Sequence, residues 1–214
     1  MIVILAMVAA FLGLRLYSVL GRRTGQEEQP ASFPEERAPA TLVQPSLPQP
    51  VAAERRPGDS LIAPEAEAGI RQMIGLDRNF DVTQFVDGAR AAYGMILEAF
   101  WHGKGEDLRW LCDGEVASSF EQAIAQREAQ GQVLENRLVR INKARIVDAG
   151  VAGRVASLTV QFDADISAVT RDRDGHVIAG SMSDAITTHD VWTFSREIGS
   201  TDPNWKLSET DEAA

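Results

Sequence analysis

The sequence predicts an α+β domain in which N-terminal helices pack on a curved antiparallel sheet of about four strands. Between residues 81 and 131, apolar side chains recur every three or four positions, which is typical of amphipathic helices. After Gly131 apolar and polar side chains alternate, as in strands that bury one face. Helices followed by strands favour a domain with its helices gathered on one side of the sheet.

The first long helix is predicted to begin at Asp81, an N-cap residue with Gln84 as its capping-box partner. Its apolar positions continue to about Trp101. A short helical turn over 106–111 and a second amphipathic helix over about 113–131 complete the helical half. The side chains expected to face the core are Phe85, Val86, Ala89, Tyr93, Ile96, Leu97 and Phe100 in the first helix, and Val116, Phe120 and Ile124 in the last.

The strand half is predicted from period-two alternation. Residues 132–148 indicate one strand or two broken ones, and residues 185–196 and 205–207 indicate two more. The alternation is clearest over 156–169. There the buried face is expected to hold Leu158, Val160, Phe162, Ala164 and Ile166, and the solvent face Thr159, Gln161, Asp163, Asp165 and Ser167.

Residues 1–21 predict a transmembrane anchor. The first 14 are all apolar or glycine, and a helix over 1–20 would be about 30 Å long, close to the thickness of a bilayer core. A cleaved signal peptide is disfavoured because no basic residue precedes the apolar run, and a surface-lying helix because the run has no polar face. The residues expected to contact the membrane interface are Arg15, Tyr17, Arg22 and Arg23. Since basic flanks stay in the cytoplasm, we expect a single-pass protein with its N-terminus outside and its C-terminal domain in the cytoplasm.

A disordered Pro-rich linker is predicted over residues 22–64. Eight of the nine prolines lie between Pro30 and Pro64, and large apolar side chains are few, so burial cannot offset the entropy of ordering this segment. The folded domain is assigned to 65–210 and a short tail to 211–214.

Residues 65–80 regain helical spacing ahead of the main domain. Ile70, Met73 and Ile74 share one face. We expect a helix packed on the domain, the alternative being an amphipathic helix that touches lipid or a partner.

The charge distribution argues against a nucleic-acid partner. Of the net charge of −10, residues 81–214 contribute −9, with 22 acidic and 13 basic side chains. Binding to phosphates is driven by Lys and Arg, so an acidic domain is not attracted to them. The single cysteine, Cys112, has no internal disulfide partner, which fits a reducing compartment.

The sequence contains few candidates for catalysis or metal binding. It has no nucleophile elbow, phosphate-binding loop, HExxH, CxxC or dinucleotide-binding motif. The best catalytic pairing is His189 with Asp163 or Asp165 across neighbouring strands, on the predicted solvent face. Asp163 and Asp165 alone, without turn geometry, make a weak cation site. We therefore expect no catalytic residue, no metal and no cofactor.

A curved sheet around a long helix leaves an apolar concavity of the kind in which ligands bind. The candidates to line it are Tyr93, Phe162, Ile166, Trp192 and Phe194. For each of them, simple filling of the core is the alternative.

Four segments of the domain resemble the Tim44-like domain family: FVDGARAAYGMILEAFWHGKGEDLRWL at 85–111, EVASSFEQAIAQREAQGQ at 115–132, ISAVTRDRDGHVIAG at 166–180 and DVWTFSREIGSTDPNWKL at 190–207. Its members include the mitochondrial import-motor scaffold, relatives on the large mitochondrial ribosomal subunit and α-proteobacterial inner-membrane proteins. The segment RLYSVLGRRTG at 15–25 is similar to the bacterial members. The resemblance implies a nuclear-transport-factor-two-like (cystatin-like) cone with an apolar pocket and no catalytic residues.

Together these features predict a non-enzymatic, membrane-tethered adaptor that binds a protein or lipid at the inner membrane, linked to protein translocation or membrane-protein biogenesis. A translocase, insertase, chaperone or ribosome is the expected kind of protein partner. The alternatives are a small pocket enzyme of the same broad fold (an isomerase, cyclase or hydrolase) and a periplasmic secretion-system component.

Overall fold

The computed structural model describes residues 60–212. The predicted anchor, most of the linker and the interface residues Arg15, Tyr17, Arg22 and Arg23 lie outside this range. None of the helices between residues 60 and 212 combines the length and the apolar character needed to cross a bilayer.

The helices come first in the chain, as predicted. A 3₁₀ turn, η1 (Pro64–Ala66), leads into α2 (Glu67–Leu76), and then follow α3 (Val82–Trp101), α4 (Gly105–Leu111) and α5 (Gly114–Ala129). Asp81 caps α3 by accepting a 2.7 Å hydrogen bond from the N–H of Gln84, and Asp113 caps α5 at the N–H of Val116. Gly131 adopts φ +68° just after α5, a conformation that glycine reaches without strain.

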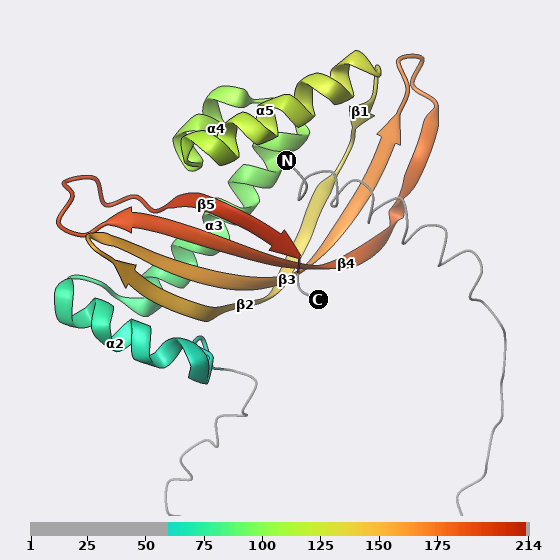
Figure 1. Ribbon diagram of the computed structural model, residues 1–214. Helices are drawn as coiled ribbons and strands as arrows, with labels where there is room; N and C mark the ends of the chain where they lie inside the picture. The colour runs from blue at the N-terminus through green and yellow to red at the C-terminus, as the bar shows by residue number, and fades with distance from the viewer. Residues whose placement is uncertain (1–59, 213–214) are drawn as a thin grey trace, which may run out of the picture.

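The strands form one antiparallel sheet. They are β1 (Val133–Leu134), β2 (Arg137–Ala152), β3 (Val155–Arg171), β4 (Val177–Glu197) and β5 (Lys206–Glu212). Both β1 and β2 pair with β3, β3 pairs with β4, and β4 pairs with β5. Figure 1 shows the long strands bending, with α3 against the inner face of the sheet, α4 and α5 beyond it, and α2 beside β2.

Segments outside the strands cover parts of both sheet edges. The N–H of Ala63 bonds to the carbonyl of Ile146 on β2, and the N–H of Ile146 bonds to the carbonyl of Leu61, both at 2.8 Å. At the other edge, the N–H of Asp113 bonds to the carbonyl of Leu207 on β5 at 2.8 Å. These bonds satisfy backbone groups that an open edge would expose.

The core lies between α3 and the inner face of the sheet. Phe85, Val86, Ala89, Tyr93 and Ile96 of α3 are buried there, as the helical spacing predicts. They pack against buried side chains of β3 and β4, including Leu158, Val160, Phe162, Ala164, Trp192 and Phe194. The prediction that alternate residues of β3 face the core is confirmed for Leu158, Val160, Phe162 and Ala164.

The N-terminal helix is shorter than predicted and packs on the domain. It ends at Leu76, and residues 77–80 form a turn. Ile70 and Met73 are buried, whereas Ile74, predicted on the same face, is exposed because the helix rests on β2 along a narrow stripe. The predicted linker also ends earlier than Pro64, since residues 61–63 pair with β2 through their backbone.

Two strand boundaries in the prediction were wrong. The strand expected to begin at 185 begins at Val177. Its first part was missed because Gly180, at φ +81°, and a register shift near 182–184 interrupt the alternation of apolar and polar side chains. The last strand, expected over 205–207, runs from Lys206 to Glu212 into the predicted tail. Its polar sequence gives no strand signal, but its backbone pairs with β4.

Candidate functional site

Four of the five predicted pocket residues gather at the centre of the inner face. The rings of Tyr93 and Phe162 stack with centroids 4.5 Å apart, and Tyr93 lies 4.6 Å from Trp192. The ring centroid of Phe194 lies 6.5 Å from that of Phe162 and 6.5 Å from that of Trp192. We call Tyr93, Phe162, Trp192 and Phe194 the inner aromatic cluster. All four are buried, so the cluster fills much of the concavity that the fold creates.

Ile166, the fifth predicted residue, lies further along β3. It pairs across the sheet with Leu138 on β2 and Ile186 on β4. Side chains directly opposite in an antiparallel sheet share a face, so these three form an apolar row on the inner face. That any of the five residues lines a ligand pocket stays a prediction.

An acidic side chain enters this inner face from β4. The hydroxyl of Tyr93 donates a 2.7 Å hydrogen bond to Oδ2 of Asp190. Burial raises the pKa of the Asp190 carboxyl, against the opposing effect of the Tyr93 and Thr188 hydroxyls. The pKa of Tyr93 is raised as well, by its burial and by the nearby Asp190. In the same cluster, the indole Nε1 of Trp192 is buried with no hydrogen-bond partner among the described residues.

A groove of about 580 Å³ opens between α3, α4 and the start of β2. Its apolar lining includes Met95 and Trp110, whose exposed fractions are 47% and 60%, together with Leu138. Gly94 lies across the groove from Leu138, and a Cβ at this position would be in ordinary van der Waals contact with it, at 3.5 Å. The polar side chains at this groove are Glu98, Lys104 and Asp107. We call it the α3–α4 groove.

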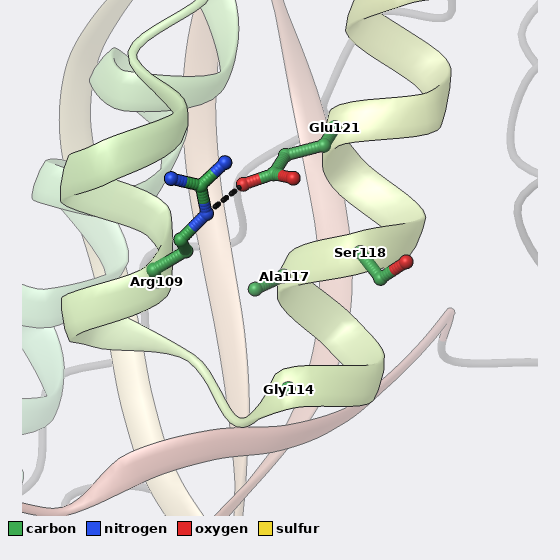
Figure 2. Close-up of a pocket in the computed structure, with 5 residues that line it drawn as sticks. All are labelled: Arg109, Gly114, Ala117, Ser118 and Glu121. Atoms are coloured by element: carbon green, nitrogen blue, oxygen red, sulfur yellow. Dashed lines mark ion pairs between the residues drawn. The ribbon is translucent and has the colours of Figure 1, made fainter.

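A smaller groove of about 190 Å³ lies between α4 and α5. Figure 2 shows the Arg109 guanidinium reaching across from α4 to Glu121 on α5, with Nε 2.6 Å from Oε1. Gly114, Ala117 and Ser118 form the rest of the lining. Because its two charged groups neutralise each other, this groove offers no free charge to a ligand.

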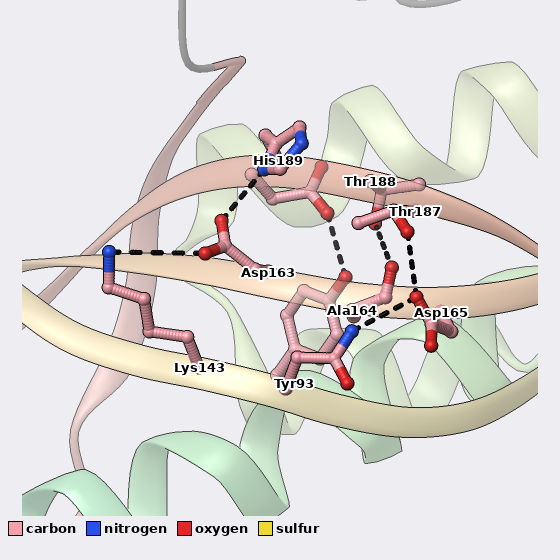
Figure 3. Close-up of polar contacts among 10 residues, drawn as sticks. Tyr93, Lys143, Asp163, Ala164, Asp165, Thr187, Thr188 and His189 are labelled. Atoms are coloured by element: carbon pink, nitrogen blue, oxygen red, sulfur yellow. Dashed lines mark hydrogen bonds and ion pairs between the residues drawn. The ribbon is translucent and has the colours of Figure 1, made fainter. Parts of the chain in front are cut away.

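The outer face of the sheet carries a network of paired polar side chains (Figure 3). Nδ1 of His189 lies 2.8 Å from Oδ1 of Asp163, and Nζ of Lys143 lies 3.9 Å from Oδ2 of the same carboxylate. The proximity of His189 and Asp163 that the sequence predicted is thus confirmed. Both groups face solvent, which gives no enclosed site for chemistry.

Asp165 corrects the predicted solvent face of β3. It is only 9% exposed, and Ser167 is also buried, although both were predicted to be wet. Cross-strand neighbours cover Asp165: Arg140 Nε donates at 2.7 Å, Asn142 at 3.0 Å and Thr187 Oγ1 at 2.8 Å. The hydrogen bonds from Thr187 and Arg140 hold the pKa of this carboxyl below its usual value.

One group of metal-ligand type occurs among residues 60–212. Asp172, Asp174 and His176 in the β3–β4 turn have ligand atoms within 4.8 Å of one another. Oδ1 of Asp172 accepts the backbone N–H groups of Asp174 and His176, so the carboxylate closes the turn. These hydrogen bonds within the turn explain why the three side chains lie close together.

The fold and the grooves define a class of protein: an α+β domain with a filled interior and an apolar groove on its helical side. Residues 66–212 match the family model of the Tim44-like domain. The chain therefore belongs to the Tim44-like domain family. A comparison with curated protein sequences gave no match.

The solved structures that are similar to this chain include the following two. The intermembrane space region of the chloroplast protein ARC6 has 15% identity and a TM-score of 0.43, over 60% of this chain and 96% of that one. A protein of the NTF2-like family from Streptomyces avermitilis has 16% identity and a TM-score of 0.33, over 63% of this chain and 99% of that one. With TM-scores below 0.5, these similarities carry no functional argument.

Sequence reasoning missed the α3–α4 groove. Met95 and Trp110 sit within amphipathic helices, where a large apolar residue is ordinarily read as core. The available signal was position: Met95 lies off the stripe of Phe85, Ala89, Tyr93 and Ile96. Neither the inward placement of Asp190 nor its hydrogen bond to Tyr93 was predicted; the available signal was that neighbouring residues of a strand face opposite sides, and His189 was predicted on the solvent face.

Proposed function

We propose that this protein is a non-enzymatic, membrane-tethered adaptor whose domain binds a protein partner or lipid at the inner membrane, in protein translocation or membrane-protein biogenesis. Membership of the Tim44-like family supports a scaffold role in membrane-associated processes. The proposal includes the predicted anchor over 1–21, the linker after it and a cytoplasmic domain.

The α3–α4 groove is the observation that carries this proposal. A Trp at 60% exposure beside an exposed Met is unusual for a solvated helix surface and is typical of binding surfaces. The inner aromatic cluster fills much of the concavity of the sheet. The α3–α4 groove, on the outside of the helices, is therefore the apolar surface to which a partner can bind.

The groove fits an apolar side chain presented by a protein segment with basic flanks. Glu98 and Asp107 supply two carboxylates at the groove against the one ammonium of Lys104. The surrounding domain is also acidic, which disfavours anionic phosphates as the principal ligand. An amphipathic helix lying in a groove is a common form of such recognition.

The alternative of a pocket enzyme requires an inward-facing acid or histidine in a cavity. Asp190 is such an acid, but its carboxylate is held by Tyr93, and neither of the two grooves includes it. The adaptor proposal is therefore the better supported one.

The test is site-specific photo-cross-linking of the full-length chain in native membranes. A photoreactive residue replacing Trp110 should capture a defined protein, and Met95→Glu should abolish that capture by placing a charge in the groove. The matched control carries the same residue at Val155, which is also exposed but lies at the β2–β3 turn. Capture of lipid alone at position 110 would assign the groove to lipid, and capture of neither would contradict the proposal.

A further inference from the structure

The chain enters the domain alongside β2. Ile62 forms a parallel bridge with Ile146. The N–H of Ala63 donates to the carbonyl of Ile146, and the N–H of Ile146 donates to the carbonyl of Leu61, both at 2.8 Å. Nη2 of Arg145 also donates to the carbonyl of Ile62, at 3.4 Å. Because the bridge is parallel, the chain that precedes Leu61 joins the domain from the side on which β2 begins.

That side of β2 leads to the α3–α4 groove. Leu138, which lines the groove, lies eight positions before Ile146 in β2. Eight residues of a strand span about 26 Å at roughly 3.3 Å per residue. An equal stretch counted back from Ile62 is therefore long enough to bring residues 54–56 to the groove. Among residues 60–212, no segment pairs with the outer edge of β2 between residues 137 and 145, so the backbone edge along this path is open.

The groove and the residues that can reach it carry opposite charges. Glu98 and Asp107 give the groove two carboxylates against the one ammonium of Lys104, so its net charge is −1. Residues 51–57 have the sequence VAAERRP, in which two arginines outweigh one glutamate and leave a net charge of +1. Charge complementarity therefore favours this segment as an occupant of the groove.

The exposed indole of Trp110 fits an arginine in particular. Trp110 is 60% exposed in the groove, and Asp107 lies three residues before it on α4. A guanidinium can lie flat on an indole ring while it bonds to a neighbouring carboxylate. The same domain already contains such an arrangement, because the Arg196 guanidinium lies 4.9 Å from the centroid of the Trp205 ring and pairs with Asp77.

We propose that Arg55 and Arg56 of the same chain occupy the α3–α4 groove when no partner is bound. One guanidinium lies on the Trp110 ring, and both lie near the carboxylates of Glu98 and Asp107. The contact is intramolecular, at an effective concentration in the millimolar range for a short linker, so it forms even if it is too weak to hold two separate molecules together.

This contact regulates the site of the proposed function, and it rests on that proposal in so far as a partner binds the same groove. A partner segment with basic flanks has to displace the two arginines of the chain itself. Segments that bind the groove more weakly than Arg55 and Arg56 are therefore excluded.

Disulfide trapping in the full-length chain, in mild detergent, tests the contact. Ala53→Cys keeps both arginines, and together with Met95→Cys it should give an intramolecular disulfide under mild oxidation, at a yield independent of protein concentration. The matched control is Ala53→Cys with Val155→Cys, because Val155 is exposed to the same 47% as Met95 but lies at the opposite end of β2. The native Cys112 is buried, and this burial raises its pKa to about 12, so it should not compete.

The same cysteine pair tests the charges. Arg55→Gln and Arg56→Gln made together should strongly reduce the disulfide between positions 53 and 95, and about 0.5 M salt should reduce it as well, because exposed charges are screened. Arg37→Gln, further along the linker, should leave the yield unchanged. Equal trapping at positions 95 and 155, or trapping that survives the loss of both arginines, would overturn the proposal. A disulfide that forms only between molecules would overturn it too and assign the contact to a second copy.

Partner capture separates this inference from the proposed function. A photoreactive residue at position 95 leaves Trp110 in place, and Arg55→Gln with Arg56→Gln should then raise capture by at least about twofold, because a groove occupied half the time or more binds a partner correspondingly less well. Capture of a partner without trapping between positions 53 and 95 would overturn the contact and leave the adaptor proposal standing. Trapping without any capture would contradict the adaptor proposal and support the contact alone.

Discussion

The hydroxyl of Tyr93 on α3 donates a 2.7 Å hydrogen bond to Asp190 on β4, 97 residues later in the chain. Tyr93 is fully buried and stacks on Phe162, so its ring is fixed by packing while its hydroxyl reaches the carboxylate. The bond joins the helical half of the domain to the sheet half. It also supplies a partner for an acid that would otherwise face apolar surroundings.

Tyr93→Phe should destabilise the domain by about 1–3 kcal/mol, because it leaves the Asp190 carboxylate without this donor while the ring packing is kept. Urea denaturation near neutral pH measures the change. The same substitution made together with Asp190→Asn should cost less, since no buried carboxylate then loses its donor. Equal costs in the two backgrounds would show that the hydrogen bond contributes little.

Asp190 and Asp165 should affect stability with opposite dependence on pH. The folded-state pKa of Asp190 is raised, mainly by burial. Above the ordinary carboxyl pKa of about 4 the unfolded chain loses this proton first, so the contribution of Asp190 is lost as pH rises through its folded pKa. The folded-state pKa of Asp165 is lowered, chiefly by the Thr187 hydroxyl. Its contribution is present above the ordinary pKa and is lost as pH falls through the folded value.

Denaturation of the two asparagine variants over a pH series checks these signs. Relative to the wild type, Asp190→Asn should gain stability as the pH rises from about 4 to 7. Asp165→Asn should be destabilised near neutral pH, with the difference shrinking in acid. Parallel curves for the two variants would contradict the assignment of one acid to the inner face and the other to the hydrogen-bonded outer face.

The order of elements was predictable because each depends on local signals. Asp81 lies four residues before Phe85 and Asp113 three residues before Val116, where the two apolar helical patterns begin, and the structure shows both aspartates as N-caps. The buried face of β3 was predictable too, because strict alternation of apolar and polar residues is also a local signal. Burial on that face depends on side-chain polarity alone, which the sequence displays directly.

Features that depend on a distant partner were not predictable. Asp165 is polar and alternates correctly, yet three neighbours on two other strands cover it. The strand over 206–212 has a polar sequence, and only its pairing with β4 makes it a strand. The α3–α4 groove likewise arises where α4 and Leu138 approach α3, a juxtaposition that no local period encodes.

Two glycines in α2 should respond oppositely to alanine. A Cβ at Gly69 would lie 1.8 Å from the carbonyl oxygen of Ala149 on β2, whereas at Gly75 nothing lies within 4 Å. Gly69→Ala should therefore push α2 off the sheet and cost about 1–3 kcal/mol. Gly75→Ala should stabilise by up to about 1 kcal/mol through helix propensity. Urea denaturation of both variants decides the matter, and a neutral Gly69→Ala would show that α2 does not rest on β2 as described.

Arg127 on α5 should stabilise the C-terminal end of α3. Its guanidinium donates 3.2 Å hydrogen bonds to the carbonyls of Phe100 and Trp101 and lies 5.3 Å from the centroid of the Phe100 ring. These carbonyls belong to the last turn of α3, where most of the usual backbone donors are missing, although that of Phe100 also accepts the N–H of Gly103 at 3.3 Å. Burial lowers the pKa of Arg127, but a guanidinium stays charged at neutral pH.

Arg127→Lys should accordingly cost about 1 kcal/mol, because an ammonium keeps the charge but cannot present the planar fork or lie flat on the ring. Arg127→Met keeps the aliphatic packing but removes the guanidinium donor from both carbonyls, so it should cost more, about 1–3 kcal/mol. The matched control is Arg154→Lys, because the Arg154 side chain is 72% exposed beside Glu197 and the change should stay within about 0.5 kcal/mol. If Arg127→Lys were as neutral as Arg154→Lys, the charge alone would suffice and the fork geometry would have no part in joining α5 to α3.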